Sequence, residues 1–450
     1  MKHVIIGTGP AGVIAAETLR KRQPDASIIL IGSEPEPPYS RMAIPYHLIG
    51  DITEQGTYLR KTDGYFAARN IKLLQQRVTA LNAADRQITL DDGRNLDFDR
   101  LLLATGSRPV RPPIDGMDLP GVVNCWTLED ARKIIAGCQR GDDVVLMGAG
   151  FIGCIILEAL AKRGVNLTVV EMENRMVPRM MDEKSGTLLK QWCENKGVRV
   201  LTSTKVKAVS QESASPSAPQ QPANERKGGL LGWLFGKKLE AEPVAAAPVP
   251  TGRLVVELEG RDPMTVDLLI CATGVKPNTD LASGVLDVKH GILVDEHLQT
   301  SQPGIYAAGD VAEGRDFSTG GYSVQAIQPT AVEHGHLAAI NMSEGAEVLH
   351  RGSINMNVLD TMGLISASFG LWEGADGGDS STLYDPERYR YINLQFEDDV
   401  LVGANTLGMT QHIGVMRGLI QNRMRLGKWK DKLMEDPSRV MEAYLAHRVP

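Results

Sequence analysis

Cysteine and long hydrophobic runs are scarce in this sequence of 450 residues. The five cysteines are widely spaced and form no C-x-x-C pair, so neither a disulfide framework, an iron–sulfur cluster nor another metal site is indicated. No stretch of about 18 apolar residues occurs, which excludes a membrane-spanning helix. The first residues lack the pattern of a signal peptide. We therefore expect a cytoplasmic protein.

The sequence also lacks a strong excess of charge of one sign. Lys and Arg number 48 and Asp and Glu 55, which gives a net charge of −7. A mildly acidic chain gives no general reason to expect nucleic acid as a partner. The length allows about two to four domains. Glycine is the abundant residue, with 46 copies, and much of it occurs in short clusters that follow apolar segments.

The first glycine cluster follows an apolar segment, residues 3–7, that is typical of a buried parallel strand. A helical pattern and a second apolar strand, which leads to Glu34, come after the cluster, and this order is the full dinucleotide-binding fingerprint. The first glycine makes the tight turn, the second lets a pyrophosphate approach, and the third lets the helix pack on the strand. Glu34 is expected to accept hydrogen bonds from ribose hydroxyls. The cluster consists of Gly7, Thr8, Gly9, Pro10, Ala11 and Gly12.

The same fingerprint occurs a second time. An apolar strand at residues 143–147 precedes the second cluster, and a helix and another strand, which ends at Glu171, follow it. A carboxylate at that position favours the free 2′-hydroxyl of NAD over the 2′-phosphate of NADP. Arg175 and Arg179 lie nearby and oppose that preference. The second cluster consists of Gly148, Ala149, Gly150, Phe151, Ile152 and Gly153.

Three further segments, at residues 101–109, 268–279 and 300–314, complete a set of five motifs in order. With this set the sequence resembles the FAD-dependent pyridine nucleotide–disulfide oxidoreductases. The resemblance implies an α/β fold with two Rossmann-like dinucleotide-binding domains and a C-terminal α+β interface domain. The implied boundaries are 1–115 and 275–345 for the FAD domain, 116–274 for the inserted NAD domain, and 346–450 for the interface domain.

The resemblance also implies roles for single residues. Asp310 would bond the flavin ribityl chain, Arg41 would pair with the FAD pyrophosphate, and the helix that starts near Pro329 and Thr330 would point its N-terminus at the N1/O2 edge of the flavin. The other expected contacts with FAD or NAD are Val78, Thr105, Gly106, Gly274 and Gly309.

Within the family, residues 32–50 resemble the branch of rubredoxin reductases, nitrite reductase flavin modules and CoA-disulfide reductases. Met42 stands where single-cysteine relatives have their redox cysteine, so disulfide chemistry is disfavoured. Tyr46 and Ile155 replace a Lys and a Glu that form an ion pair beside the flavin in relatives, which implies a less polar nicotinamide pocket. Tyr46 is a candidate for the flavin environment, with plain packing as an equal alternative.

Residues 211–252 interrupt the second nucleotide-binding region with a Pro-, Ala- and Ser-rich stretch that is typical of disorder. Within it, 227–238 contains Leu, Trp and Phe side chains flanked by lysines. This segment is interpreted as a docking peptide for a partner or for the inner face of a membrane. An inert linker and packing onto the protein itself remain alternatives.

The leading interpretation is a flavoenzyme that transfers electrons from NADH through FAD to a protein acceptor such as a rubredoxin, a ferredoxin or a partner subunit. The absence of a redox cysteine favours this output over disulfide reduction. Two alternatives stay open, a quinone reductase at the membrane surface and a flavoprotein scaffold or redox sensor. A homodimer through the C-terminal domain is also left open.

Overall fold

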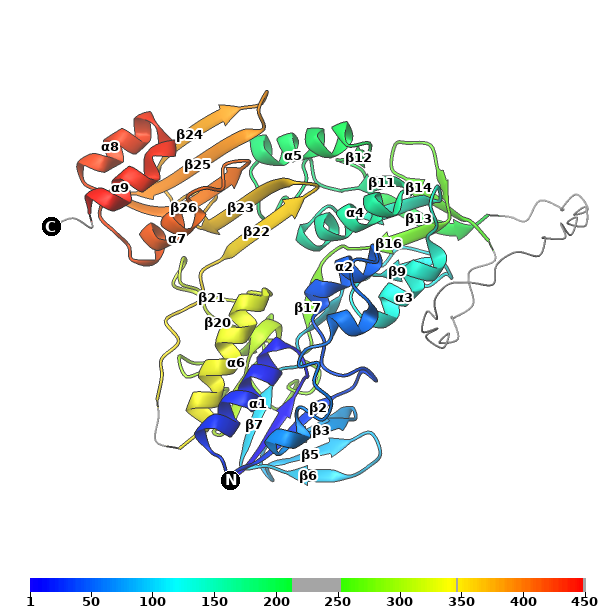
Figure 1. Cartoon of the computed structure of the whole chain (residues 1–450), viewed down its shortest axis with the longest axis vertical. Coiled ribbons are helices and arrows are strands. Elements are labelled where there is room, and N and C mark those ends of the chain that lie inside the picture. The colour runs from blue at the N-terminus through cyan, green and yellow to red at the C-terminus, as the bar shows by residue number, and fades with distance from the viewer. Residues whose placement is uncertain (213–251, 345–346, 448–450) are drawn as a thin grey trace, which may run out of the picture.

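The first glycine fingerprint belongs to a five-stranded parallel sheet in the computed structural model, which describes residues 1–212, 252–344 and 347–447. The strand order is β19-β7-β1-β2-β3. Helices α1 and α6 pack against each other beside this sheet (Figure 1). The elements are β1 (Lys2–Ile6), α1 (Pro10–Arg22), β2 (Ser27–Gly32), β3 (Ile71–Gln75), β7 (Arg100–Leu103), β19 (Ile305–Ala307) and α6 (Gln328–Met342).

A second five-stranded parallel sheet, β12-β11-β10-β16-β9, contains the second fingerprint. In both sheets the strand that precedes the fingerprint, β1 or β10, lies at the centre. The fifth strand differs in origin, because β9 comes before its fingerprint in the chain whereas β19 comes long after its own. The elements are β9 (Val122–Asn124), α3 (Leu128–Gly137), β10 (Asp143–Met147), α4 (Phe151–Arg163), β11 (Asn166–Val170), α5 (Glu183–Asn195), β12 (Arg199–Leu201) and β16 (Leu268–Cys271).

Each parallel sheet has an antiparallel three-stranded sheet inserted in the chain, before β7 in the first sheet and before β16 in the second. These insertions are β4 (Val78–Asn82), β5 (Gln87–Leu90) and β6 (Asn95–Asp97), and β13 (Val206–Gln211), β14 (Leu254–Leu258) and β15 (Met264–Val266). The predicted insertion at 211–252 falls between β13 and β14, and its segment 227–238 lies outside the described residues.

Short elements connect the two parallel sheets and lead to α6. Strands β8 and β17 pair antiparallel where the chain crosses from one sheet to the other. The short elements are α2 (Ile44–Leu48), β8 (Ser107–Pro109), β17 (Val275–Pro277), β18 (Ile292–Leu293), β20 (Ala312–Arg315) and β21 (Tyr322–Ser323).

The C-terminal part forms an antiparallel sheet of order β22-β23-β26-β25-β24 with three helices beside it. It lies next to the second parallel sheet and above the first in Figure 1. In the stretch 412–427, α7 ends at Gln421 and Arg423 adopts a left-handed φ of 45°, so the helix does not continue to residue 427. The elements are β22 (Met356–Thr361), β23 (Leu364–Gly370), β24 (Asp379–Asp385), β25 (Arg390–Glu397), β26 (Val400–Leu407), α7 (Ile413–Gln421), α8 (Lys428–Glu435) and α9 (Val440–Ala446).

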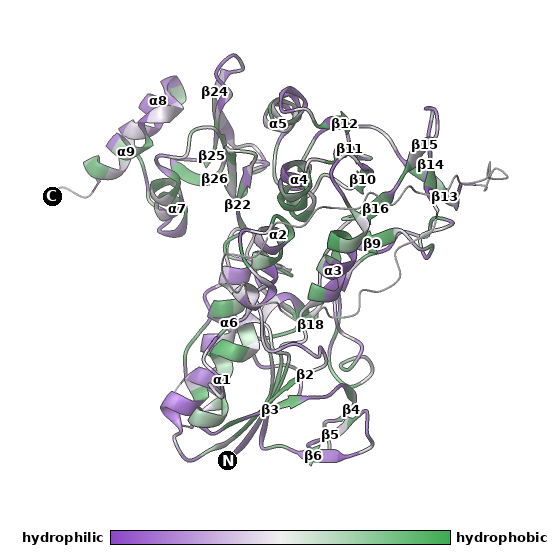
Figure 2. Cartoon of the chain, turned by 45° about the vertical axis from the view of Figure 1, so that its right-hand side comes forward, coloured by the Kyte–Doolittle hydropathy of each residue, from purple (hydrophilic) through white to green (hydrophobic). Residues whose placement is uncertain are grey.

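Apolar strands form the centres of both parallel sheets, as the α/β interpretation requires. All strand residues from Val4 to Ile6 and from Leu101 to Leu103 are buried, as expected for parallel strands covered on both faces. Figure 2 shows the same contrast, since β9 and β16 are largely hydrophobic whereas the exposed strand β6 is hydrophilic. Among the described residues, no helix is long and apolar enough to cross a membrane.

Candidate functional site

A cavity of about 1750 Å³ opens where the two parallel sheets and the C-terminal sheet meet. Ordinary small-molecule pockets measure about 300–1,000 Å³, so this cavity has room for a dinucleotide and a second ligand. The turns after β1 and β7, the 3-10 helix Gly309–Val311 and the first turn of α6 line one part of it. The first turn of α4, parts of β22 and α7, and residues 76–79, 124–127 and 352–354 also line it.

The fold itself requires glycine at two of the three glycine positions of the first fingerprint. A Cβ on Gly7 would lie 1.9 Å from the Ala104 carbonyl oxygen, and one on Gly12 would lie 1.9 Å from the Gly7 oxygen. Backbone atoms of the protein therefore exclude any side chain at both positions. A Cβ on Gly9 would meet nothing within 4 Å, so this residue faces open space in the cavity. The N-terminus of α1 has no side-chain cap, and its N–H groups are available for a phosphate.

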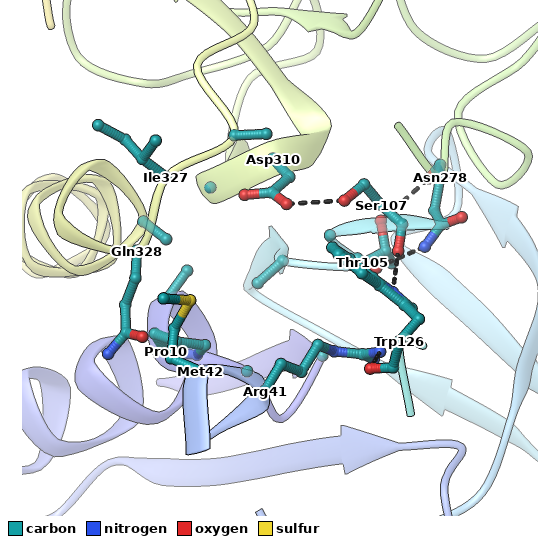
Figure 3. Close-up of a pocket in the computed structure, with 18 of the residues that line it drawn as sticks. Pro10, Arg41, Met42, Thr105, Ser107, Trp126, Asn278, Asp310, Ile327 and Gln328 are labelled. Atoms are coloured by element: carbon teal, nitrogen blue, oxygen red, sulfur yellow. Dashed lines mark hydrogen bonds between the residues drawn. The ribbon is translucent and has the colours of Figure 1, made fainter. Parts of the chain in front are cut away.

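Glu34 and Arg41 contact each other at the cavity wall. Arg41 Nη2 lies 2.7 Å from Glu34 Oε1, and Arg41 Nη1 donates to the Trp126 carbonyl oxygen at 2.8 Å (Figure 3). The guanidinium also lies 5.0 Å from the centre of the Trp126 ring. Arg41 is therefore a fixed positive charge beside the first fingerprint, and it reaches across to the segment that enters α3.

Asp310 presents a carboxylate to the cavity from the 3-10 helix that follows β19. The Ser107 hydroxyl donates to its Oδ2 at 2.7 Å (Figure 3). Burial raises the pKa of Asp310, and the hydrogen bond from Ser107 opposes that rise. The other oxygen of this partly buried carboxylate is suited to a ligand hydroxyl in the cavity.

The first turn of α6 lies beside Asp310. Gln328, Pro329 and Thr330 line the cavity, and the helix has no side-chain cap at its N-terminus. The packing that places it there is tight, since a Cβ on Gly335 would lie 2.2 Å from the Ala11 oxygen of α1. The positive end of the α6 dipole is thus directed at the same cavity.

The predicted segments 101–109 and 268–279 are joined to each other where β8 pairs with β17. Asn278 Nδ2 donates to the Thr105 carbonyl at 2.8 Å, and the Thr105 hydroxyl donates to the Asn278 carbonyl at 3.0 Å (Figure 3). Gly106 and Gly274 both have positive φ, 66° and 113°, where a side chain would be strained. Thr105, Gly106 and Asn278 line the cavity, whereas Gly274 does not.

The second fingerprint repeats the geometry of the first. A Cβ on Gly148 would lie 2.5 Å from the Ala272 oxygen, one on Gly153 would lie 2.2 Å from the Gly148 oxygen, and one on Gly150 would meet nothing within 4 Å. Its acidic residue is placed differently, because Glu171 is only 6% exposed. Glu171 accepts hydrogen bonds from the N–H groups of Ala149 at 2.7 Å and Glu173 at 3.0 Å.

The two arginines predicted to oppose an NAD preference differ in their contacts. Arg175 donates to the carbonyl oxygens of Met181 at 2.9 Å and Pro178 at 3.2 Å, which commits its guanidinium to its own loop. Arg179 is exposed. Arg175 is therefore held away from the role that the sequence assigned to it.

The exposed sulfur-containing side chain in the cavity wall is a methionine, and the cysteines of the chain are buried. Met42 lines the cavity and is 46% exposed. All five cysteines are buried and free, and burial raises the pKa of Cys125 and of Cys193 to about 12. Ile155 lines the cavity where relatives have an acid, while Tyr46 is 57% exposed and is not among the lining residues.

The cavity therefore brings together most, but not all, of the predicted residues. Those outside its wall are Tyr46, Gly12, Gly148, Gly150, Gly153, Glu171 and Gly274. Those in its wall are Gly7, Gly9, Pro10, Ala11, Glu34, Arg41, Val78, Thr105, Gly106, Phe151, Ile152, Gly309, Asp310, Pro329 and Thr330.

Sequence reasoning missed two contacts of the site. Ser107, which bonds Asp310, lies inside the predicted segment 101–109, and its position directly after Gly106 was the available signal. Trp126 carries no comparable signal, because it contributes a backbone oxygen and a ring face to Arg41. The contributions of β22 and α7 also depend on tertiary packing alone.

Comparison with known proteins identifies the family. Residues 1–335 match the pyridine nucleotide-disulphide oxidoreductase family. The chain belongs to this family. It is accordingly an NAD(P)H-dependent flavin oxidoreductase whose cofactors are FAD and NAD(H). The open space at Gly9, the uncapped helix N-termini and the Asp310 carboxylate fit the phosphates and hydroxyls of FAD.

Several relatives match nearly the whole chain. It is 29% identical over 443 residues to the NADH-dependent phenylglyoxylate dehydrogenase subunit epsilon of Aromatoleum evansii, with 97% of this chain and 95% of that protein covered. It is 30% identical over 431 residues to the ferredoxin–NAD(+) reductase component of the anthranilate 1,2-dioxygenase system of Burkholderia cepacia, with 93% of each covered. A chain in the crystal structure of the covalent putidaredoxin reductase–putidaredoxin complex matches with a TM-score of 0.82 and 25% identity, over 100% of this chain and 99% of that one.

Proposed function

We propose that this protein oxidises NADH and passes the electrons through FAD to a protein electron carrier. The observation that carries the proposal is one continuous cavity that joins the first fingerprint to the first turn of α4 in the second, with no exposed thiol in its wall. The cavity is large enough for both nucleotide rings to meet. The absence of a reactive thiol favours electron transfer over disulfide reduction as the output.

We place FAD along the first fingerprint and NADH along the second, in domains with the predicted boundaries. In this assignment the N-terminus of α1 and Arg41 bind the FAD pyrophosphate, and Glu34 and Asp310 accept hydrogen bonds from its hydroxyls. Phe151, Ile152 and Ile155 provide an apolar surface for the nicotinamide where α4 enters the cavity.

FAD supplies the chemistry of accepting a hydride and releasing electrons singly. The chain positions the two rings and sets the charge around them. The first turn of α6 directs its positive end at the cavity and stabilises negative charge there. Met42, Pro45 and Ile155 contribute apolar groups to the cavity wall near the reacting region.

A protein carrier is the proposed acceptor because relatives of nearly the same length are named for such partners. The matched solved structure contains putidaredoxin, and the Burkholderia relative is a ferredoxin reductase component. The Aromatoleum relative is one subunit of a larger dehydrogenase, so a partner subunit is the same class of acceptor. A cytoplasmic location, peripheral membrane docking through 227–238 and a homodimer stay predictions.

The experiment is a comparison of acceptors with purified holoprotein. NADH oxidation is followed with ferricyanide, with the disulfide of CoA, and with putidaredoxin and rubredoxin as carrier probes. We expect turnover with ferricyanide and with at least one carrier, and only background rates with the disulfide. Reduction of the disulfide faster than of both carriers would overturn the proposal.

A further inference from the structure

One arginine of α3 links three carboxylates near the cavity, although it does not line the cavity itself. Arg132 Nη2 and Nε lie 2.7 and 2.9 Å from the two oxygens of Glu54, and its Nη1 lies 2.7 Å from Glu36. Glu129, one turn earlier in α3, is more distant at 3.5 Å. The guanidinium of Arg132 therefore contacts Glu36 and Glu54 at the same time, and both of these residues follow β2 of the first parallel sheet.

Glu36 and Glu54 lie on the two arms of one loop that follows β2. Backbone contacts join the two arms. The Ser40 N–H donates to the Thr57 carbonyl oxygen at 2.9 Å, and Tyr39 and Tyr58 form an isolated antiparallel β-bridge. The first arm also carries Glu34 and Arg41 into the cavity wall. A group that holds both arms thus fixes the position of these two cavity residues.

The side chain of Glu36 is only 7% exposed, and its sole ion pair among the described residues is with Arg132. The hydrogen bonds from Arg132 also lower the pKa of Glu54. Removing the arginine would leave a nearly buried carboxylate without a counter-charge, and the loop would have to move to hydrate it. A lysine offers one point charge and cannot span both carboxylates as the planar guanidinium does.

We propose that Arg132 is a positioning residue for FAD: from the second parallel sheet's side, it holds the loop that presents Glu34 and Arg41 to the cofactor. The FAD site is then completed by a helix outside the FAD fingerprint. This inference rests on the proposed placement of FAD in the first half of the cavity.

The test is FAD titration of apoprotein, followed by flavin fluorescence. We expect Arg132→Ala to raise the dissociation constant for FAD by about tenfold or more, as for a buried pair that has lost one partner. Arg132→Lys should fall between this variant and the wild type. Lys133→Ala is the matched control, because Lys133 is the next residue of α3 and its ion pair, at 3.5 Å, is with the exposed Glu129. It should bind FAD like the wild type.

A second measurement separates positioning from general damage. At saturating FAD, Arg132→Ala should regain the wild-type kcat with ferricyanide and the wild-type KM for NADH. If Arg132→Ala does not fold, Glu36→Gln replaces it and should weaken FAD binding, with Glu129→Gln unchanged. Equal FAD affinity in all variants, or turnover that saturating FAD does not restore, would overturn the role of Arg132. Wild-type protein that binds no FAD would instead overturn the proposed function.

Discussion

The two fingerprints of this chain have the same glycine geometry but different surroundings. In each, the first and third glycines are closed by backbone and the second faces open space. The first opens into the large cavity, where Glu34 is partly exposed and paired with Arg41. The second keeps Glu171 buried against its own loop. The motif therefore provides the phosphate turn, while the neighbouring segments decide how deeply a nucleotide is enclosed.

The largest expected effect separates the two sites completely. Gly9→Val should leave the protein folded but without flavin, since an added Cβ meets no protein atom within 4 Å and the side chain would occupy the phosphate approach. Gly150→Val should keep the flavin but lose its reduction by NADH. Visible absorbance per protein measures the flavin content, and its loss after NADH is added measures flavin reduction. Circular dichroism measures whether each variant is folded. A yellow Gly9→Val protein would contradict the assignment of the first site to FAD.

Acid should weaken the packing around α6 through a buried histidine pair, in which His334 lies on α6 and His350 follows that helix in the chain. The rings of His334 and His350 lie 4.7 Å apart and share the Ser353 hydroxyl, at 3.3 and 3.1 Å from their Nε2 atoms. Burial lowers the pKa of His334 to about 3, and burial also lowers that of His350.

Because the folded pKa of His334 is below its unfolded value, the unfolded chain binds the extra proton as pH falls from 6.5 toward 3. Stability should fall in that window by about 1.4 kcal/mol per pH unit for each such proton. His334→Gln should flatten this dependence in thermal melts. His336→Gln, at an exposed position of the same helix, should leave it unchanged. If stability depends on pH equally steeply in the two variants, His334 is not the group that causes the acid sensitivity.

A smaller effect concerns the second site. Glu171→Gln should lower kcat/KM for NADH by about tenfold, the size of a lost charged hydrogen bond of about 1.5 kcal/mol, and should shift the preference toward NADPH. Glu173→Gln is the control, because its side chain is exposed. Steady-state kinetics with both nucleotides measures the change. A wild-type enzyme that prefers NADPH would show that Glu171 does not select for the 2′-hydroxyl of the NADH ribose.

The smallest effect is expected from thiol alkylation. Iodoacetamide should lower the rate of NADH-dependent ferricyanide reduction by no more than about 20%. The cysteines are buried, and the pKa values of four of them are raised. This includes Cys154, which follows the second fingerprint, and Cys125 in the cavity wall. Inactivation that tracks alkylation of one cysteine would reverse the interpretation of Met42.

The sequence predicted what short-range pattern determines. The strands, the turns and the helix starts at Gly9 and Gly150 follow from apolar runs and glycine spacing, and the structure has them at those places. Side-chain partners depended on distant segments and were not predictable. Arg41 bonds Trp126, Asp310 bonds Ser107, and Glu171 turns to Ala149, each over more than 20 residues of chain. Tyr46 is 57% exposed and lies outside the cavity wall, which its position in the sequence did not reveal.

The most direct test of the central claim is an anaerobic half-reaction with wild-type holoprotein. NADH is mixed with the yellow protein, the visible flavin band is followed, and oxidised putidaredoxin or rubredoxin is then added. The account predicts that NADH bleaches the flavin and that a carrier restores its colour while becoming reduced. A flavin that NADH does not bleach, or that only a disulfide reoxidises, would contradict it.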